Sequence, residues 1–432
     1  PAVWISVSLP ASNRGPIPGS FTFTRDHPIG SITVPFPLSG TAIAGTDYEI
    51  IPASVTFPDG SLSQTITVNP IAAAPDSTSE TLVLTLNSGA TYTLGSPSSA
   101  TLTIDDHITS IAAGAWNVGT TWNSGNPAPV TGTQNAGDGY GVAHTVTSND
   151  TNSNSQALVA GSLRVMSGGV LDLARLHATT NQNVSYNLPA TTIEDGGTLR
   201  FRCSTGSSTH TIAAAIAFAG NSTLRINGGS YDNSSNLTGT LSGTGNVAII
   251  SDTNAGSTTV PRQISVAKAN NPFAGNWSVT HTGGGDDYGA LRANAANALG
   301  TARGLNSLGG STLNGVNSTL KLNQPWNKST ASLALSGGSP LVQIGNAAST
   351  IGDLSGSAGV IQGSGSSSSL TVNQTPEGVY TGEIGTNLTF IKSGSAPQLG
   401  QICGREMGRE MNAGGFIELT GPDVLIAAVP LH

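Results

Sequence analysis

Thr198-Leu199-Arg200-Phe201 and Thr223-Leu224-Arg225-Ile226 share one pattern: a polar residue, leucine, a basic residue and an apolar residue. The pattern returns as Ser162-Leu163-Arg164-Val165, as Thr319-Leu320-Lys321-Leu322 and, more weakly, as Ala290-Leu291-Arg292-Ala293. Because side chains alternate across a strand, the leucine and the second apolar residue face one way and the basic residue faces the other. The separations lie near multiples of the roughly 20–35 residues of a solenoid coil. The pattern therefore predicts an elongated parallel β-helix or solenoid.

The composition supports stacked strands. Of 432 residues, 56 are glycine and only 9% are charged. A coil with one apolar face cannot bury that face alone, so stacking on neighbouring coils has to supply the core. Few charges suit such a stack, because identical charges repel along a ladder of strands. The chain is therefore expected to be folded and all-β.

Residues 1–107 have a different pattern, with short alternating runs separated by turns. Seven or so short strands in about 100 residues are typical of an immunoglobulin-like β-sandwich. We therefore predict two domains, a sandwich over 1–107 and, over 108–432, a solenoid rich in Gly, Ser and Asn that ends in an apolar strand tail. The clearest sandwich strands are predicted at residues 3–9, 20–24, 54–57, 64–68, 81–86 and 100–104.

The sandwich region resembles the Calx-β domain. The resemblance rests on residues 40–48 (GTAIAGTDY), 54–60 (SVTFPDG), 80–86 (ETLVLTL) and 100–106 (ATLTIDD). It implies a seven-stranded sandwich of a kind found often in extracellular adhesion proteins, with carboxylates gathered at one end in the Ca²⁺-binding members. The residues that match the family's metal ligands are Asp47, Glu80, Asp105 and Asp106.

Other carboxylates that the resemblance implies are replaced in this chain. Residues 11–13 (ASN) stand where a Glu is usual, and residues 72–74 (AAA) stand where ligand-bearing members have consecutive Asp residues. Ca²⁺ takes six to eight oxygen ligands, mostly from clustered carboxylates. The acidic end is therefore either a weak Ca²⁺ site or a vestige of one, and no other cofactor is expected.

The second region resembles passenger-type β-helices that carry autotransporter-associated β-strand repeats. The resemblance covers about residues 110–420, and residues 398–412 depart from it. The stretches that match are residues 271–277 (NPFAGNW), 291–300 (LRANAANALG), 351–356 (IGDLSG), 380–384 (YTGEI) and 388–395 (LTFIKSGS).

Catalysis on a solenoid would need carboxylates that converge on one face. The candidates are Asp172, the pair Glu194-Asp195 and the pair Asp286-Asp287. Both pairs have the glycine-rich context of exposed turns, and adjacent strand residues point to opposite faces. We therefore expect a protein that is not an enzyme. A carbohydrate-active enzyme, a polysaccharide lyase or hydrolase, is the alternative.

The basic residues of the repeated pattern allow two interpretations. They could form a stripe that binds an anionic surface glycan, or they could be the solvated outer partners of the repeat, which also discourage edge pairing. A net charge of −8 argues against a nucleic-acid partner. No apolar run approaches the roughly 20 residues of a membrane-spanning helix. Cys203 and Cys403 fit no metal-binding spacing, and whether they form a disulfide stays open.

These observations favour a secreted structural or adhesive protein located outside the cell or on the bacterial cell surface. A self-assembling subunit of an extracellular fibre or coat is the form that we expect, and a Ca²⁺-responsive adhesion module is a further alternative. The apolar residues 416–420 and 424–429 near the end of the sequence are expected to join copies of the chain into a homo-oligomer or filament.

Overall fold

The structure is a computed structural model. Contacts divide the chain into two compact units, one made of Pro1–Ala112, Val118–Gly141 and Ala160–Ser162, and one made of Ala113–Asn117, Val142–Val159 and Leu163–His432. The residues that the structure describes are 1–9, 11–12, 18–71, 79–105, 108–110, 112–122, 139–148, 155–175, 183–203, 208–228, 233–252, 263–282, 290–300, 305–310, 318–373, 378–380, 382–393, 398–399 and 417–419.

The first unit contains a β-sandwich. Its sheets have the strand orders β7-β3-β1-β9 and β2-β10-β8-β5, and β4 and β6 form a separate ribbon. Pairing between neighbours is antiparallel except for β1 with β9 and β10 with β2. The strands are β1 (Ala2–Leu9), β2 (Ala11–Ser12), β3 (Gly19–Arg25), β4 (Ile32–Pro35), β5 (Leu38–Gly40), β6 (Ser54–Phe57), β7 (Ser63–Val68), β8 (Glu80–Thr85), β9 (Thr93–Leu94) and β10 (Ser99–Asp105).

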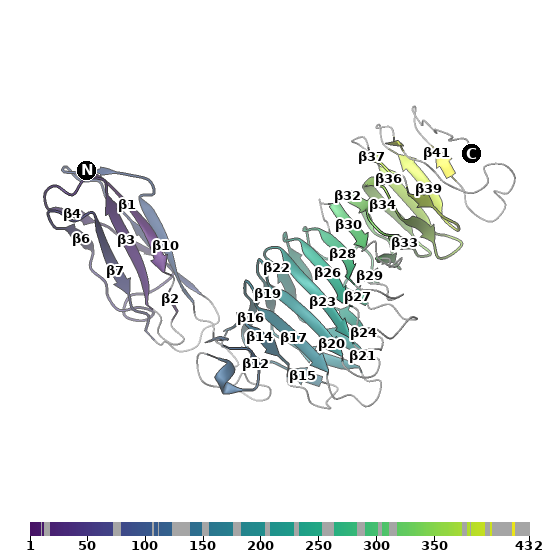
Figure 1. The fold of residues 1–432 in the computed structure, drawn as a ribbon, viewed down its shortest axis with the longest axis horizontal. Helices are drawn as coiled ribbons and strands as arrows, with labels where there is room; N and C mark the ends of the chain where they lie inside the picture. Colours follow the sequence, from purple (N-terminus) through teal and green to yellow (C-terminus); the bar gives the residue numbers. More distant parts are fainter. Residues whose placement is uncertain are drawn as a thin grey trace. The chain divides into compact units, whose positions relative to one another are not determined.

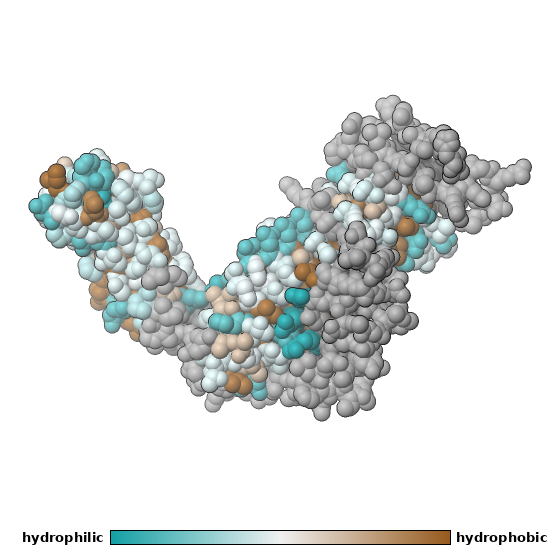
Figure 2. All heavy atoms as spheres, viewed as in Figure 1, coloured by the Kyte–Doolittle hydropathy of each residue, from teal (hydrophilic) through white to brown (hydrophobic). Residues whose placement is uncertain are grey.

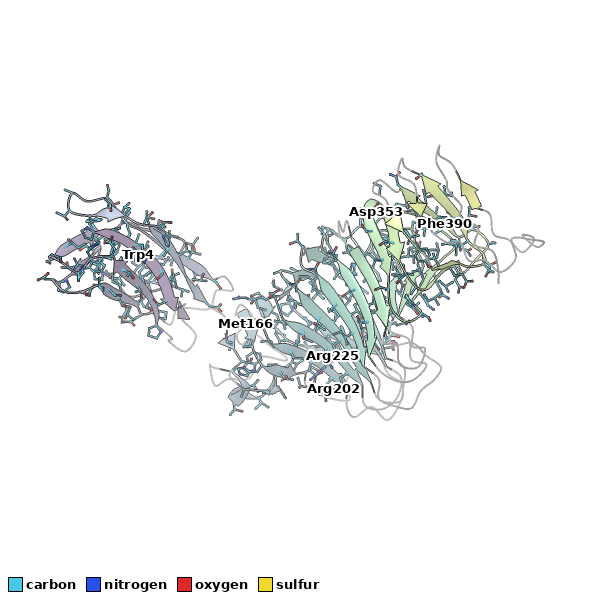
Figure 3. All side chains as sticks on the ribbon, turned by 45° about the horizontal axis from the view of Figure 1, so that its top comes forward. Trp4, Met166, Arg202, Arg225, Asp353 and Phe390 are labelled. Carbon is cyan, nitrogen blue, oxygen red and sulfur yellow. The ribbon has the colours of Figure 1, made fainter. Side chains whose placement is uncertain are left out.

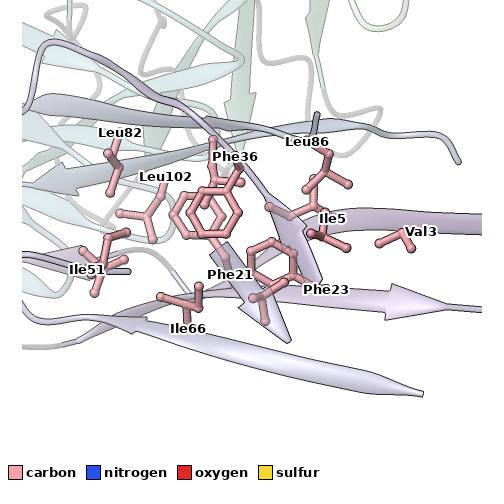
Figure 4. Close-up of a cluster of buried hydrophobic side chains, with 14 of the residues drawn as sticks. Val3, Ile5, Phe21, Phe23, Phe36, Ile51, Ile66, Leu82, Leu86 and Leu102 are labelled. Atoms are coloured by element: carbon pink, nitrogen blue, oxygen red, sulfur yellow. The ribbon is translucent and has the colours of Figure 1, made fainter. Parts of the chain in front are cut away.

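Alternation along the strands builds the core of the sandwich. In β3 every second residue is buried, namely Gly19, Phe21, Phe23 and Arg25, while the residues between them are half-buried. Figure 4 shows this cluster, in which the rings of Phe23 and Phe36 lie 5.4 Å apart. All six predicted strands are present within one or two residues. The strands β2, β4, β5 and β9 were not predicted, because two to four residues are too few for a clear alternation.

Arg25 closes one end of the sandwich core. Its side chain is 1% exposed, and its guanidinium donates to four backbone carbonyl oxygens. The guanidinium also lies 5.3 Å from the ring centroid of Phe57. The charge is therefore stabilised by peptide dipoles and an aromatic face, and the guanidinium ties two turns together. The acceptors are Ser61 at 2.6 Å, Gly30 at 2.8 Å, Pro28 at 2.6 Å and Pro58 at 2.9 Å.

The second architecture is a parallel β-solenoid that runs from β13 to β38 (Figure 1). Its strands belong to a six-stranded, a thirteen-stranded and a ten-stranded sheet, which also include β11, β12, β39 and β41. The described residues contain one short 3-10 helix, η1 (Gly119–Thr121), and no α-helix. The fold class predicted from the sequence, an immunoglobulin-like sandwich followed by a parallel solenoid, is confirmed.

The strands of each sheet follow the order of the chain. The six-stranded sheet contains β11 (Ile108–Thr109), β13 (Gly139–Val142), β16 (Ser162–Val165), β19 (Thr191–Ile193), β22 (Ile216–Phe218) and β25 (Leu241–Gly243). The thirteen-stranded sheet contains β12 (Gly114–Ala115), β14 (Thr145–Thr147), β17 (Val170–Arg175), β20 (Thr198–Cys203), β23 (Ser222–Gly228), β26 (Val247–Asp252), β28 (Trp277–Thr282), β30 (Leu305–Gly310), β32 (Asn327–Leu335), β34 (Ala348–Gly356), β36 (Ser369–Asn373), β39 (Thr389–Ser393) and β41 (Ile417–Leu419). The ten-stranded sheet contains β15 (Ser155–Ala157), β18 (Val184–Asn187), β21 (Ser208–Ile212), β24 (Asn233–Leu237), β27 (Gln263–Val266), β29 (Ala290–Ala293), β31 (Thr319–Leu322), β33 (Leu341–Ile344), β35 (Val360–Gly363) and β38 (Glu383–Ile384). A two-stranded ribbon pairs β37 (Gly378–Val379) with β40 (Gln398–Leu399).

Two pairs of leucines from the repeated pattern stack in register on neighbouring coils. Leu199 in β20 pairs with Leu224 in β23, and Leu291 in β29 pairs with Leu320 in β31. All four side chains are buried. Coil length varies because the corners differ: Ser369 pairs with Thr389, 20 residues on, while Val247 pairs with Trp277, 30 residues on. This variation explains the irregular spacing of the pattern in the sequence.

Polar corners are built from stacked asparagines. The Asn246 amide donates to Asn221 at 2.8 Å, and the Asn276 amide donates to Asn246 at 2.8 Å. Asn271 is buried, and its oxygen accepts from the backbone N–H of Leu241 at 2.8 Å. An amide both donates and accepts, so identical residues in successive coils satisfy one another.

One corner depends on glycine. Gly243, which ends β25, has a φ of 97°, a conformation that L side chains rarely adopt. A Cβ atom at this position would overlap the carbonyl oxygen of Phe218 in the coil below. Close approach of two coils therefore requires glycine here.

The apolar residues near the end of the sequence are placed in part. The backbone of β41, within the predicted strand at 416–420, pairs in parallel with β39 of the same chain. Residues 424–429 and Cys403 lie outside the described residues. Among the described residues, no helix is long and apolar enough to cross a bilayer.

We predict that Arg25→Met lowers the free energy of unfolding by about 3 kcal/mol, because four carbonyl oxygens lose their donor in a site closed to water. Urea unfolding of the full chain, followed by hydrogen exchange in β3 and β7, measures this loss. The control is His27→Ala, whose side chain is 69% exposed and which should change stability by no more than about 0.5 kcal/mol. Equal losses in the two variants would contradict the role of Arg25.

Candidate functional site

Two neighbouring strands, β8 and β10, carry acidic residues at one end of the sandwich. In the antiparallel pair of β8 and β10, Glu80 lies opposite Ile104. Asp105 follows directly, and its Oδ1 accepts a hydrogen bond from the Ser79 hydroxyl at 3.0 Å. Glu80 is 8% exposed. Two of the four predicted ligands therefore lie at the same end of one sheet.

Asp47 comes to this end from the loop that follows β5. The N–H of Ala42 donates to the carbonyl oxygen of Thr81, the residue after Glu80, at 3.0 Å. The N–H of Ile71 donates to the carbonyl oxygen of Asp47 at 2.9 Å. The backbone thus gathers three predicted residues at one end of the sandwich, while the fourth, Asp106, lies outside the described residues.

Two of the predicted ligands are hydrogen-bonded within the protein. The Asp47 carboxylate accepts from the backbone N–H of Ile43 at 2.6 Å, which stabilises its own loop. One oxygen of Asp105 is likewise used by Ser79. In the part of the chain that is described, no three His, Cys, Asp or Glu side chains are grouped so that they could hold a metal ion. Residues 72–74 lie outside that part.

A second polar cluster lies on the thirteen-stranded sheet. The side chain of Asp172 in β17 is 0% exposed and lies between two arginines of β20. Arg200 Nη2 is 2.9 Å from Asp172 Oδ2, and Arg202 Nη2 is 2.5 Å from the same oxygen. The Thr147 hydroxyl donates to this carboxylate at 3.4 Å. The cluster joins three successive coils through complementary charges.

The figures place this cluster on the solenoid. Arg202 and Arg225 are labelled on neighbouring strands in Figure 3. On the face drawn in Figure 2, the coloured surface beside β14 and β17 carries both hydrophilic and hydrophobic patches. Because Asp172 is enclosed and ion-paired, this carboxylate stabilises the stack rather than facing a substrate.

The other carboxylates that were considered for catalysis have different partners from those of Asp172. Glu194 Oε1 lies 2.5 Å from Arg164 Nη2, and Asp195 Oδ1 accepts from the backbone N–H of Asn221 at 2.9 Å. The pair Asp286-Asp287 lies outside the described residues. Each carboxylate that can be placed is therefore held by an arginine or by backbone of an adjacent coil.

The five basic residues of the repeated pattern do not form one stripe. Arg164 belongs to the six-stranded sheet, while Arg200 and Arg225 belong to the thirteen-stranded sheet. Arg292 and Lys321 belong to the ten-stranded sheet. The idea of a single basic stripe is wrong, because corners of different length move the same pattern onto different faces of the coil.

Two important arginines were not singled out from the sequence. Arg202 lies two residues after Arg200, so strand alternation places both on one face, and this signal was available. Arg25 gave no comparable signal, because its partners are backbone carbonyl oxygens rather than side chains.

Asp172→Asn should lower the free energy of unfolding by about 2 kcal/mol, since it leaves two neighbouring guanidinium groups without their shared anion. Both arginines keep partial access to water, which limits the loss. Denaturant unfolding of the full chain gives the value. Asp195→Asn is the matched control, because an amide oxygen can still accept from Asn221. A loss no larger than that of the control would refute the role given to Asp172.

Millimolar Ca²⁺ should raise the melting temperature of the sandwich by less than about 2 °C, because stabilisation grows with occupancy of a tight site. Differential scanning calorimetry of the full chain with Ca²⁺ and with chelator measures the shift. A rise of several degrees that Asp105→Ala abolishes would establish a functional Ca²⁺ site.

Comparison with known proteins finds a similarity for part of the chain. Residues 30–107 match the Calx-beta domain. Solved structures that match include one described as the apo form of the Calx CBD1 domain, 20% identical, which covers 24% of this chain and 97% of that chain with a TM-score of 0.21. The structure of CBD12 from CALX1.2 is 23% identical and covers 24% of this chain and 46% of that chain, with a TM-score of 0.21. The structure of the calcium binding domain CBD12 of CALX1.1 is 20% identical and covers 26% of this chain and 50% of that chain, with a TM-score of 0.21. No curated protein matches the chain. Residues 30–107 of the N-terminal sandwich are therefore similar to the Calx-beta domain.

Proposed function

We propose that the protein is a secreted bacterial protein with a structural or adhesive role at the cell surface. The observation that carries this proposal is the in-register parallel solenoid from β13 to β38, in one chain with a Calx-beta domain. A solenoid presents long faces on which each coil repeats the chemistry of the one before. Such faces suit extended contact with a polymer or a surface.

The outer side of the ten-stranded sheet supports an adhesive role. Ser155, Ser185, Thr211 and Asn236 occupy matching positions on successive strands β15, β18, β21 and β24. Their neighbours in sequence, among them Tyr186, point inward and are buried. The result is a row of short hydroxyl and amide groups along the solenoid, which can donate and accept hydrogen bonds without a net charge.

The resemblance of residues 110–420 to passenger-type β-helices supports secretion. The alternative, a polysaccharide lyase or hydrolase, finds less support in the geometry. Asp172 and Glu194 are both ion-paired with arginines, and Asp195 accepts from backbone. Carboxylates engaged in this way stabilise the stack.

The proposal includes homotypic assembly through residues 416–420 and 424–429. Part of the first segment already pairs within the chain, because β41 continues the sheet after β39. An intermolecular contact would therefore use either the outer edge of β41 or the second segment, and a head-to-tail contact of that kind would propagate into a filament unless it closed a ring.

The proposed location can be tested in the source bacterium with an antibody against the full chain. Cells are separated into cytoplasm, envelope and medium, and intact cells are treated with an added protease. We expect the protein in the envelope or medium and cleavage on intact cells. A protein confined to the cytoplasm and protected from protease would overturn the proposal.

A further inference from the structure

Two cations of the ten-stranded sheet lie side by side. Arg292 in β29 pairs in register with Lys321 in β31. In each strand the flanking residues, such as Leu291 and Leu320, are buried in the solenoid core. Because side chains alternate, Arg292 and Lys321 point to the outer face of the sheet, where both are half-buried.

The row continues on the next two strands. Lys321 pairs with Gln343 in β33, and Gln343 pairs with Gln362 in β35. Both glutamines are half-buried like the cations. Neighbouring strands lie about 4.8 Å apart, so four long polar side chains follow one another along the solenoid at this spacing.

Like charges on directly neighbouring strands destabilise a sheet. Burial lowers the pKa of Arg292, and burial together with the charge of Arg292 lowers the pKa of Lys321. For a basic side chain, a lowered pKa means that the surroundings disfavour the charged form. Both side chains are therefore in surroundings that disfavour their positive charge.

Two other arginines that the structure describes have a carboxylate partner within the protein. Arg164 is paired with Glu194, and Arg200 with Asp172. Within the described ranges, Arg292 and Lys321 have no carboxylate within ion-pair distance. The buried Nε of Arg292 has no hydrogen-bond partner there either. The pair is thus a local electrostatic conflict that a bound anion would relieve.

We propose that Arg292 and Lys321, aided by Gln343 and Gln362, bind the carboxylate or sulfate groups of an acidic polysaccharide. This inference deepens the surface role proposed above and rests on it for the choice of ligand. The arginine fork binds two oxygens of one anionic group, and the lysine binds as a point charge. The glutamine amides can donate to and accept from sugar hydroxyls.

A polysaccharide fits the row better than a nucleic acid does. Two cations in a chain of net charge −8 do not make the concentrated basic face that a phosphate backbone needs. A linear sugar chain laid along the solenoid could meet the cations with its acidic groups and the glutamines with its hydroxyls.

Binding of the full chain to immobilised polygalacturonate, dextran sulfate and neutral dextran tests the proposal by biolayer interferometry. We expect binding to one or both acidic polymers and none to dextran, with affinity falling as salt rises. Preference for polygalacturonate would assign carboxylate groups, and preference for dextran sulfate would assign sulfate groups. Polyuridylate is included as a nucleic-acid polyanion, for comparison with the acidic polysaccharides.

Two variants with the same change in charge locate the site. The double variant Arg292→Gln with Lys321→Gln should weaken binding about tenfold or more, because it removes both charge-assisted contacts. Lys268→Gln with Lys328→Gln removes two charges outside the row and should stay within about twofold. Gln343→Lys extends the cationic row and should tighten binding, an effect that a poorly folded variant would not produce.

Equal losses in the two double variants, no binding to either acidic polysaccharide, or tighter binding to polyuridylate would overturn the site. The melting temperature of the first double variant should be unchanged or higher, since it removes a like-charge contact. The two proposals can be refuted independently. If the protein binds acidic polymers but is confined to the cytoplasm, the binding site is supported and the surface role is refuted.

Discussion

Register-preserving contact between coils is the constraint on which the solenoid depends. In a parallel ladder each residue lies about 4.8 Å from the residue at the same position of the next coil. Val146, Leu171, Leu199, Leu224 and Ile249 form one such column, and all five are 0% exposed. Every coil therefore buries its apolar face on the equivalent face of its neighbours, and no coil has a core of its own.

The same constraint selects the polar residues. Asparagine can stack on asparagine, because one amide donates while the next accepts, as Asn221, Asn246 and Asn276 do. Charges cannot stack in this way, so they occur where the next coil offers the opposite sign, as Asp172 does for Arg200. Arg292 and Lys321 break this rule, and a broken local rule is where a functional contact is to be expected.

The architecture could be predicted from the sequence because period-two alternation and recurring leucines are local signals. The position of each basic residue on the coil could not. The Leu-Arg pattern is the same around Arg164, Arg200 and Arg292, yet these residues lie on three sheets, because corner length decides which face a strand joins. Corner length is visible in the sequence only once the neighbouring strand is known.

In the sandwich, too, some features could be predicted from the sequence and others could not. Its main strands follow from alternation, and the gathering of Asp47, Glu80 and Asp105 at one end follows from the resemblance to the Calx-β domain. The resemblance does not reveal that the Asp47 carboxylate caps its own loop or that Asp105 accepts from Ser79. Such short contacts depend on loop conformation, which differs between members of one fold.

The central claim is the register of the stack, and disulfide trapping tests it most directly. In a chain with Cys203 and Cys403 replaced by Ser, cysteines at Ser185 and Thr211 lie in register, at a separation within the roughly 4.4–6.8 Å between Cα atoms that a disulfide spans. Cysteines at Ser185 and Thr209 are offset by two residues, about 7–8 Å apart. Peptide mapping after mild oxidation should show the first crosslink and little of the second. An offset pair that crosslinks as fast as the matched pair would contradict the register, and with it the account of every row of side chains along the solenoid.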